Sequence, residues 1–582
     1  MKAKLSKLSA YFPALRRFLI ASLFLYTIYS FIVKGILQFI FNRILIFAGV
    51  TGLSKETILT VIKDPIALFF LVLFLVLVAF FLIGEFAVLT LAVTDQWHRD
   101  SLKILLKKFP QKVKQLLSWQ FIIVFFYLCL MIPLGNLGFN SLLLSHLKIP
   151  DFIGEELAKT QTGSLLYGGL MVVIAYLNIR LITFLPILGL TDSSPLKAFQ
   201  ISWRESTFKK LLKRTARLVL LTTLSFVITI ILVIGITIIF ANLDSKNDNL
   251  PLATLFYSLI AFLYTLFLLS TKFFFIIEAT RQLDLPKELQ TRTHAKMSTK
   301  GRFALVSFIL FFGVLWVASN ALDIYLVKKN PDEIVIAHRG NVKAGVENSI
   351  EAMQAAKKAG AAYSEMDVVM TKDKRFVVIH DNNLKRLAGV DNTVSNMTLK
   401  ELQKLTLHQG KFTSHIASLE EFLAAAKAIK QPILIELKPY GHEPKDYVER
   451  FLKVLKEQNA TKDNKVMSLD LDVIQKVEKL APEISTGYVI PIHMGPLLNY
   501  AVDFYAVEEF SYNTLFALTA EQQKKDVYVW TINDETLMDK MLIGPANGII
   551  TDELGIFKEA SQDMKADTSY LQRALRLFNS RQ

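Results

Sequence analysis

The chain has 582 residues, 52% of them hydrophobic, and a formal net charge of +15. This hydrophobic share is high for a soluble protein, so membrane insertion is the first property to test. The one cysteine, Cys129, excludes a disulfide framework and a thiolate metal site. The basic balance suits either nucleic acid or a membrane protein, and only the positions of the charges can decide between them.

Seven apolar stretches are long enough to cross a bilayer, which takes about 20 residues of α-helix. They are residues 18–40, 66–93, 117–139, 165–190, 218–241, 252–277 and 303–322. The first is longer than the apolar part of a signal peptide, and no small-residue cleavage site follows it, so we predict an uncleaved span. Residues 1–328 are therefore predicted to form a polytopic membrane domain, a helical bundle of seven spans.

Lysine and arginine gather in alternate connecting segments. The segment before the first span is basic and has no acid, and residues 94–116, 191–217 and 278–302 are also basic, whereas DFIGEELAK and NLDSKNDN hold more acids than bases. Short basic loops stay in the cytoplasm. We therefore predict a multi-pass plasma-membrane protein with a cytoplasmic N-terminus and an extracellular C-terminal part. The bilayer explains the charge, so no nucleic-acid partner is expected.

Three charged residues, Glu85, Arg180 and Lys272, lie inside the predicted spans. Each is near the cytoplasmic end of a helix predicted to run from outside to inside. Charges at such positions usually face the interior of the bundle and pair, and a polar cavity for a lipid headgroup is one interpretation. The other is that Arg180 and Lys272 extend to the inner headgroups.

After Lys328 the pattern changes to β-rich runs that alternate with helical ones. The runs are EIVIA, YSEMDVV, FVVIH, PILIEL, KVMSL, STGYVI, DFYAVE, VYVWTI and GIIT. Such alternation predicts parallel βαβ units. The number of runs is one too many for an eight-stranded barrel, and YSEMDVV and FVVIH are joined by a short connection, so one run is expected to be an extra strand. A TIM-type α/β barrel is predicted over residues 329–558.

Residues 559–582 are predicted to form an amphipathic C-terminal tail. The stretch SYLQRALRLFNSRQ places leucines and an aromatic residue at helical spacing between basic residues. Such a helix can lie on the membrane surface or pack against the barrel, and the sequence leaves both open.

Functional groups of such barrels collect at the C-terminal ends of the strands, and polar residues follow or end several of the predicted strands. They are His338, Arg339, Glu365, Asp367, His380, Asp381, Glu436, Lys438, Trp530, Asn533 and Asp552. Capping or support explains Asp381, Asn533 and Asp552 best. Trp530 is equally compatible with packing inside the barrel and with a wall against a glycerol chain.

Spacing assigns chemistry to the others. Glu365 and Asp367 are two apart on a strand and share a face, and with Glu436 they make a cluster of carboxylates that would repel one another unless a cation neutralised them. Oxygen ligands favour Ca²⁺ or Mg²⁺. Arg339 and Lys438 suit phosphate binding. The histidines, His338 and His380, suit proton transfer, so the pattern predicts metal-assisted phosphodiester cleavage.

The ordered series resembles the glycerophosphodiester phosphodiesterase family, whose barrel is of the PLC-like phosphodiesterase kind. The matching elements are HRG at 338–340, EN at 347–348, ExD at 365–367, HD at 380–381, ExK at 436–438, WTIN at 530–533 and GIITD at 548–552. The seven-span region resembles, mainly by architecture, the membrane domain that precedes this barrel in Gram-positive bacteria.

The resemblance implies His338 and His380 as general acid and base, and Glu365, Asp367 and Glu436 as metal ligands. It also implies that Glu347 approaches the same metal, and that Arg339 and Lys438 hold the phosphate. The implied reaction is hydrolysis of a glycerol phosphodiester to glycerol phosphate and an alcohol, with or without a cyclic intermediate. Val346, HQG at 408–410 and ASL at 417–419 depart from the family pattern in loops that would shape the substrate entrance.

An extracellular barrel would meet deacylated phospholipid headgroups or the glycerol-phosphate polymer of lipoteichoic acid. Two other functions stay open: a catalytically silent barrel that binds or regulates, and a lipid or teichoic-acid transporter with an attached hydrolase. Phosphoinositide-type phospholipase C shares the barrel and the histidine pair, but the ExD and ExK carboxylates disfavour its metal-free form. The sequence does not indicate an oligomeric state.

Overall fold

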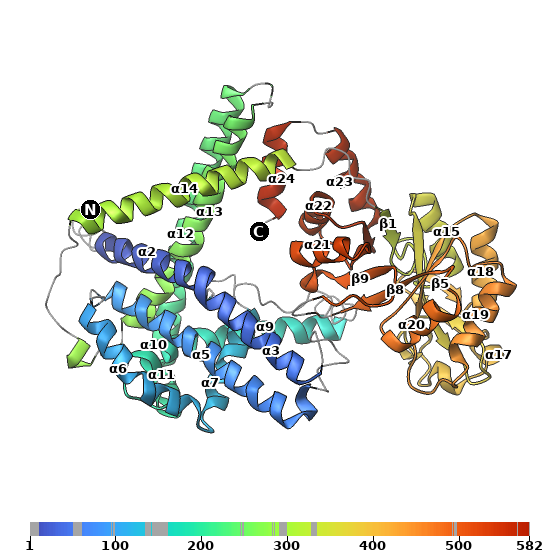
Figure 1. The fold of residues 1–582 in the computed structure, drawn as a ribbon, viewed down its shortest axis with the longest axis horizontal. Coiled ribbons are helices and arrows are strands. Elements are labelled where there is room, and N and C mark those ends of the chain that lie inside the picture. The colour runs from blue at the N-terminus through green and yellow to red at the C-terminus, as the bar shows by residue number, and fades with distance from the viewer. Residues whose placement is uncertain are drawn as a thin grey trace. The chain divides into compact units, whose positions relative to one another are not determined.

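The computed structural model describes residues 11–49, 61–94, 96, 99–133, 141, 161–244, 246, 249–281, 283–284, 286–289, 299–326, 334–491, 493, 497–566 and 569–580. The chain divides into two compact units, and Leu322–Gln582 makes up most of the second one. The first unit is helical, whereas the second contains the strands (Figure 1).

The helices of the first unit are α2 (Tyr11–Ile28), η1 (Tyr29–Val33), α3 (Lys34–Phe47), α5 (Pro65–Val93), α6 (Arg99–Leu116), α7 (Phe121–Met131), α9 (Gln161–Arg180), α10 (Phe184–Leu190), α11 (Pro195–Glu205), α12 (Phe208–Leu243), α13 (Leu250–Thr280), η3 (Lys287–Leu289) and α14 (Thr299–Leu326). Helix starts follow local chemistry. At α5, the Asp64 carboxylate accepts hydrogen bonds from the amides of Ile66 and Ala67, and Pro65 fills the first helical position, where no amide hydrogen is needed.

By length and composition, the described residues contain 6 helices able to cross a membrane, or up to 7 if a bent pair counts as one span. This agrees with the predicted bundle of spans. The bent pair is Ser101–Leu116 and Phe121–Met131, which meet at 96°. The second helix of the pair lies within the third predicted span, 117–139, and the bend falls at the beginning of that span, after the basic segment 94–116; residues 134–139 of the prediction lie outside the described residues.

The charged residues in the spans are partnered differently. Glu85 of α5 is fully buried and forms an ion pair with Lys272 of α13, and it accepts a hydrogen bond of 2.5 Å from the Ser141 hydroxyl. Arg180 does not join them: its guanidinium carbon lies 3.8 Å from the centroid of the Trp203 ring. The expected pairing therefore holds for Glu85 and Lys272 only, and it joins two long apolar helices.

Most strands of the second unit belong to one sheet that closes into a ring. Eight of them are parallel: β1 (Ile334–Ala337), β2 (Tyr363–Met370), β6 (Ile433–Leu437), β7 (Lys465–Ser468), β8 (Ser485–Ile490), β9 (Phe504–Glu508), β10 (Asp526–Trp530) and β11 (Gly548–Thr551). Strand β1 pairs with both β11 and β2, which closes the sheet into a barrel. The extra strand that the sequence predicted is β3 (Phe376–Val378), which runs antiparallel to β2.

Helices cover the outside of the barrel (Figure 1). They are α15 (Ile350–Ala359), α18 (Leu419–Ala428), α19 (Tyr447–Glu457), α20 (Leu471–Leu480), α21 (Thr514–Gln522), α22 (Glu535–Ile543) and α23 (Leu554–Ala566). Their apolar faces pack on the outward side chains of the strands, such as Met366 and Ile435, whereas the inward ones, such as Leu434 and Tyr528, fill the barrel interior.

A small subdomain stands between β3 and β6. It contains α16 (Lys385–Ala388), η4 (Val394–Asn396), α17 (Leu399–Leu402) and a hairpin of β4 (Thr406–Gln409) and β5 (Phe412–His415). Its core includes Leu384, Leu387, Leu402 and Ile416. The same cluster contains Val369 of β2 and Val377 of β3, so the subdomain is packed onto the barrel by apolar contacts.

The C-terminal helix α24 (Tyr570–Ser580) packs against α22 of the barrel. Ala574 and Leu577 are buried, and an Arg576 Nη1 atom lies 3.3 Å from Asp539 Oδ1. Of the two interpretations of the tail, the structure shows the packing one. Helix α23 also runs across the boundary predicted at residue 558, so the tail continues from the last barrel helix.

The buried pair of α5 and α13 yields a prediction about stability. Glu85→Ala leaves the Lys272 ammonium buried without its counter-charge, which costs on the order of 3–5 kcal/mol. The exchange Glu85→Lys with Lys272→Glu restores the pair and recovers a large part of that loss. Thermal unfolding of the detergent-solubilised protein measures both.

The matched control for this pair is Asp192→Ala. Asp192 is 58% exposed at its side chain and pairs with Lys108, so its loss costs at most about 1 kcal/mol. Equal stability of Glu85→Ala and Asp192→Ala would contradict the assignment of Glu85 and Lys272 as an interior pair.

Candidate active site

The strand register brings three carboxylates together at the rim of the barrel. Glu365 and Asp367 lie on the same face of β2, and Asp367 stands beside Glu436 of β6. One carboxylate oxygen from each residue lies within 4.8 Å of the other two, and all three residues are buried. The expected cluster is therefore present. Its donor set of three buried carboxylates fits a hard divalent cation.

The charges of this cluster are only partly balanced by the protein. Burial, and then the neighbouring Asp367 and Glu436, raise the pKa of Glu365 well above its ordinary value. Burial also raises the pKa of Glu436 to about 7. Asp367 behaves oppositely: burial opposes its ionisation, but Lys438, with its Nζ atom 2.9 Å from Oδ1, and then His380 and Arg339 lower its pKa. Protein cations thus neutralise Asp367 best, and the other two carboxylates need protons or a metal ion.

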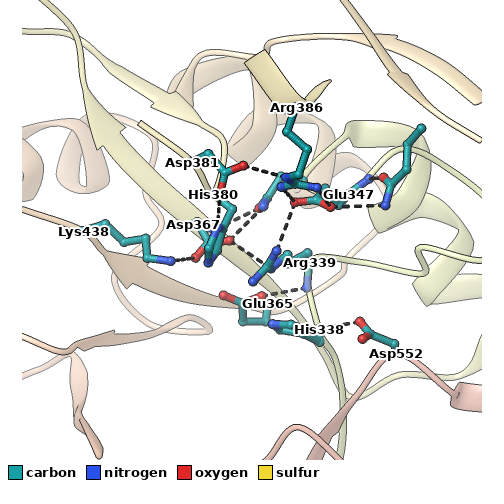
Figure 2. Close-up of polar contacts among 12 residues, drawn as sticks. His338, Arg339, Glu347, Glu365, Asp367, His380, Asp381, Arg386, Lys438 and Asp552 are labelled. Atoms are coloured by element: carbon teal, nitrogen blue, oxygen red, sulfur yellow. Dashed lines mark hydrogen bonds and ion pairs between the residues drawn. The ribbon is translucent and has the colours of Figure 1, made fainter. Parts of the chain in front are cut away.

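Two histidines stand beside the cluster, and each is bound by an aspartate (Figure 2). His338 Nδ1 lies 2.9 Å from Asp552 Oδ1, and Asn533 donates to the other oxygen of Asp552 at 3.1 Å. His380 Nδ1 lies 2.7 Å from Asp381 Oδ1. Among the described residues, neither Nε2 atom has a hydrogen-bond partner, so both remain available for proton transfer. Burial lowers the pKa of His380.

The two residues expected to hold phosphate lie against the cluster. The Arg339 amide donates to Glu365 Oε2 at 2.7 Å, and this backbone has a φ of 55°. Burial disfavours the positive charge of the Arg339 guanidinium, but the carboxylates of Asp367 and Glu347 outweigh that effect and raise its pKa. Lys438 is affected in the same way, with its pKa raised to about 12 by Asp367 and Glu436 against the effect of burial. Both side chains are therefore charged near neutral pH.

Glu347 lies beside the cluster but is not one of its three carboxylates. Its Oε1 and Oε2 atoms accept hydrogen bonds from the Nη2 and Nη1 atoms of Arg386 at 2.5 and 2.7 Å. Arg339 Nη1 and Gln409 Nε2 also donate to it, at 3.1 and 3.2 Å. The metal-binding role expected for Glu347 stays a prediction, since this carboxylate is bound by cations of the protein.

Trp530 lies at the barrel interior. Its indole Nε1 donates to the Ala506 carbonyl at 3.0 Å, and its side chain packs against the apolar cluster inside the barrel. This is the packing interpretation of the residue; contact with substrate stays a prediction.

Three further residues reach the site and were not assigned roles from the sequence. The Asn348 side chain donates a hydrogen bond from Nδ2 to Asp367 Oδ2 at 2.8 Å, and its Oδ1 atom accepts one from the backbone amide of Asp367 at 2.9 Å. Tyr440 donates to the His380 carbonyl at 3.1 Å. Arg386 links Glu347 with Asp381. The EN pair marked Asn348, but nothing in the local pattern marks Arg386 or Tyr440, because their partners are distant in the sequence or in other loops.

Comparisons with known proteins agree with this arrangement. The model of the membrane domain of glycerophosphoryl diester phosphodiesterase matches residues 7–318, and that of the glycerophosphoryl diester phosphodiesterase family matches residues 338–556. A glycerophosphodiester phosphodiesterase from Caldanaerobacter subterraneus is 30% identical over 232 residues, which are 38% of this chain and 94% of that protein.

Two solved structures are also similar. The glycerophosphodiester phosphodiesterase from Thermotoga maritima has 28% identity and a TM-score of 0.33, covering 39% of this chain and 97% of its own. A phosphodiesterase from Oleispira antarctica, solved with the product sn-glycerol-3-phosphate, has 21% identity and a TM-score of 0.36, covering 41% and 99%.

The first match extends over more than half of the chain, and the second contains every residue of the carboxylate and histidine group. The chain therefore belongs to the glycerophosphoryl diester phosphodiesterase family, as a multi-pass membrane enzyme with a catalytic barrel.

Proposed function

We propose that the protein hydrolyses glycerophosphodiesters outside the cell, to glycerol phosphate and an alcohol, in a metal-dependent reaction. The observation that carries this proposal is the group of three buried carboxylates, with oxygens within 4.8 Å of one another, flanked by two aspartate-bound histidines. Glu365, Asp367 and Glu436 would hold Ca²⁺ or Mg²⁺. When bound, the cation would polarise the phosphodiester and offset its negative charge.

The residues around the cluster would divide the remaining work. One imidazole of the His338 and His380 pair takes the proton of the attacking hydroxyl, which belongs to water or to the glycerol of the substrate. The other gives a proton to the alcohol oxygen as its bond to phosphorus breaks. Arg339 and Lys438 would hold the phosphate oxygens, because both remain charged in the buried site.

The proposed domain arrangement follows the sequence prediction. Residues 1–328 would form the membrane domain, 329–558 the extracellular barrel and 559–582 the tail. The small glycerophosphodiesters of deacylated lipids, or the polymer of lipoteichoic acid, would be the substrates that an outward-facing barrel meets. Gln409 supports a substrate role for the turn of the β4–β5 hairpin, where it binds Glu347 through both its side-chain amide nitrogen and oxygen; His415 lies at the opposite end of this hairpin.

The histidine roles predict a selective loss of turnover. His338→Ala and His380→Ala each lower kcat on glycerophosphocholine by about 10²–10⁴-fold, the usual contribution of a general acid or base. His415→Ala is the matched control. His415 is an exposed histidine of the same unit, and its substitution is expected to leave kcat unchanged. Wild-type turnover without an effect of His380→Ala would contradict the assignment, and a protein without turnover would favour a silent barrel.

Metal dependence predicts the effect of chelation on both substrate classes. Purified protein treated with a chelator loses hydrolysis of glycerophosphocholine and of lipoteichoic acid, and added Ca²⁺ or Mg²⁺ restores it. Glu436→Gln raises the metal concentration needed for half-maximal activity, because it removes one charged ligand. Glu420→Gln, at a carboxylate that pairs with Arg375, is the control. Full activity after complete chelation would refute the metal site, and the substrate that is cleaved identifies the class.

Orientation can be tested in a Cys129→Ser background, because Cys129 is the one native cysteine. A membrane-impermeant maleimide added to intact cells labels a cysteine at Lys404 of the barrel. It labels a cysteine at Lys107 only after lysis, since basic loops stay in the cytoplasm. Both positions are exposed in the structure. The reverse labelling pattern would place the barrel in the cytoplasm and exclude extracellular substrates.

A further inference from the structure

Arg386 lies between two groups that belong to different parts of the active site (Figure 2). We propose that Arg386 is a positioning residue for hydrolysis, which holds the Asp381–His380 pair and the Glu347 carboxylate in one fixed arrangement. This inference rests on the proposed proton-transfer role of His380. It adds a residue that the motif series does not contain.

All three nitrogen atoms of the Arg386 guanidinium donate hydrogen bonds. Its Nε atom donates to Asp381 Oδ2 at 2.6 Å, while Nη1 and Nη2 donate to the two oxygens of Glu347 at 2.7 and 2.5 Å. The other oxygen of Asp381 lies 2.7 Å from His380 Nδ1. A planar fork with five donors can satisfy two carboxylates at once in this way, whereas a lysine ammonium cannot.

The chain of contacts fixes the imidazole. An ionised Asp381 accepts the Nδ1 hydrogen of His380 and so leaves Nε2 to exchange a proton. Burial opposes the ionisation of Asp381, but the hydrogen bonds from His380 and then from Arg386 lower its pKa, so Arg386 helps to keep this carboxylate ionised and in place. Without the guanidinium, one oxygen of Asp381 would lose its charged partner, and the carboxylate could rotate away from His380.

The second histidine is supported differently, which makes the role of Arg386 specific. The aspartate of His338 is Asp552, and its second oxygen is bound by the neutral amide of Asn533 at 3.1 Å. Loss of Arg386 is therefore expected to affect the His380 half of the site directly and to leave the His338–Asp552 contact in place.

The fold holds Arg386 firmly enough for such a role. It lies on the short helix α16, whose Leu387 is buried in the core of the subdomain between β3 and β6, together with Leu384. Gln409, from the hairpin of the same subdomain, binds the Glu347 carboxylate that Arg386 binds. Arg386 thus connects the apolar core of the subdomain with the catalytic rim.

The test compares Arg386→Met, Arg386→Lys, Asp381→Asn and the Asp381→Asn/Arg386→Met double variant with His380→Ala. The assay is hydrolysis of glycerophosphocholine by the full-length protein with saturating Ca²⁺ or Mg²⁺. We expect Arg386→Met to lower kcat by about 100-fold with KM within about threefold, because the chemical step loses an oriented proton carrier. The kcat of the double variant is expected to lie within about threefold of the kcat of the less active single variant, because both substitutions break the same chain of contacts.

Two measurements separate positioning from simple loss of folding. Added guanidinium ion is expected to recover part of the kcat of Arg386→Ala, and Arg386→Lys to remain well below wild type, although it keeps the charge. Arg375→Met is the matched control: Arg375 pairs with Glu420 and not with a residue of the active site, so its substitution is expected to leave kcat unchanged.

The outcomes distinguish this inference from the proposed function. If His380→Ala keeps full turnover, the proton-transfer role of His380 fails. If His380→Ala loses turnover but Arg386→Met keeps kcat within about threefold of wild type, the positioning role is overturned. Arg386→Lys replaces Arg386→Met in this comparison if Arg386→Met does not fold. A rise of KM with unchanged kcat, or losses that multiply in the double variant, also overturns it.

Discussion

The burial of three carboxylates within 4.8 Å of one another is the constraint on which the catalytic unit depends. Like charges this close cannot all ionise in a buried site without nearby cations. Arg339 and Lys438 supply two positive charges, but they stabilise Asp367 most, which leaves Glu365 and Glu436 with raised pKa values. Carboxylates left without enough positive charge destabilise the protein on their own, and their oxygens suit a divalent cation that would neutralise them.

The barrel provides this arrangement because its strands are parallel and in register. Glu365 and Asp367 point inward from one strand, Glu436 from the next, and the loops after β1 and β11 bring His338 and Asp552 to the same rim. Each histidine has an aspartate from a loop end within hydrogen-bond distance of its Nδ1 atom, and neither aspartate belongs to the three-carboxylate cluster. Residues that cap helices in many proteins thus serve here to orient imidazoles.

The membrane domain meets a related electrostatic problem in a different solvent. A carboxylate buried between apolar helices has no water to stabilise it, and Glu85 is satisfied by Lys272 and Ser141. This pair is closed within the protein and joins α5 with α13. The described structure therefore uses it as a contact between helices, whereas Glu365 and Glu436 at the rim of the barrel are left with raised pKa values.

The amino-acid sequence by itself determined the features that rest on local pattern. Apolar length located the spans, the change to alternating β-rich and helical runs located the barrel, and the spacing of Glu365 and Asp367 placed both on one strand face. These predictions succeed because helix length and strand alternation depend on neighbouring residues. Only the tertiary structure decided which distant partners meet. It set a bend of 96° between α6 and α7, packed the tail on α22, and joined Glu347 to Arg386 outside the three-carboxylate cluster. Contacts between side chains far apart in the sequence depend on how the elements pack, and no local period records them.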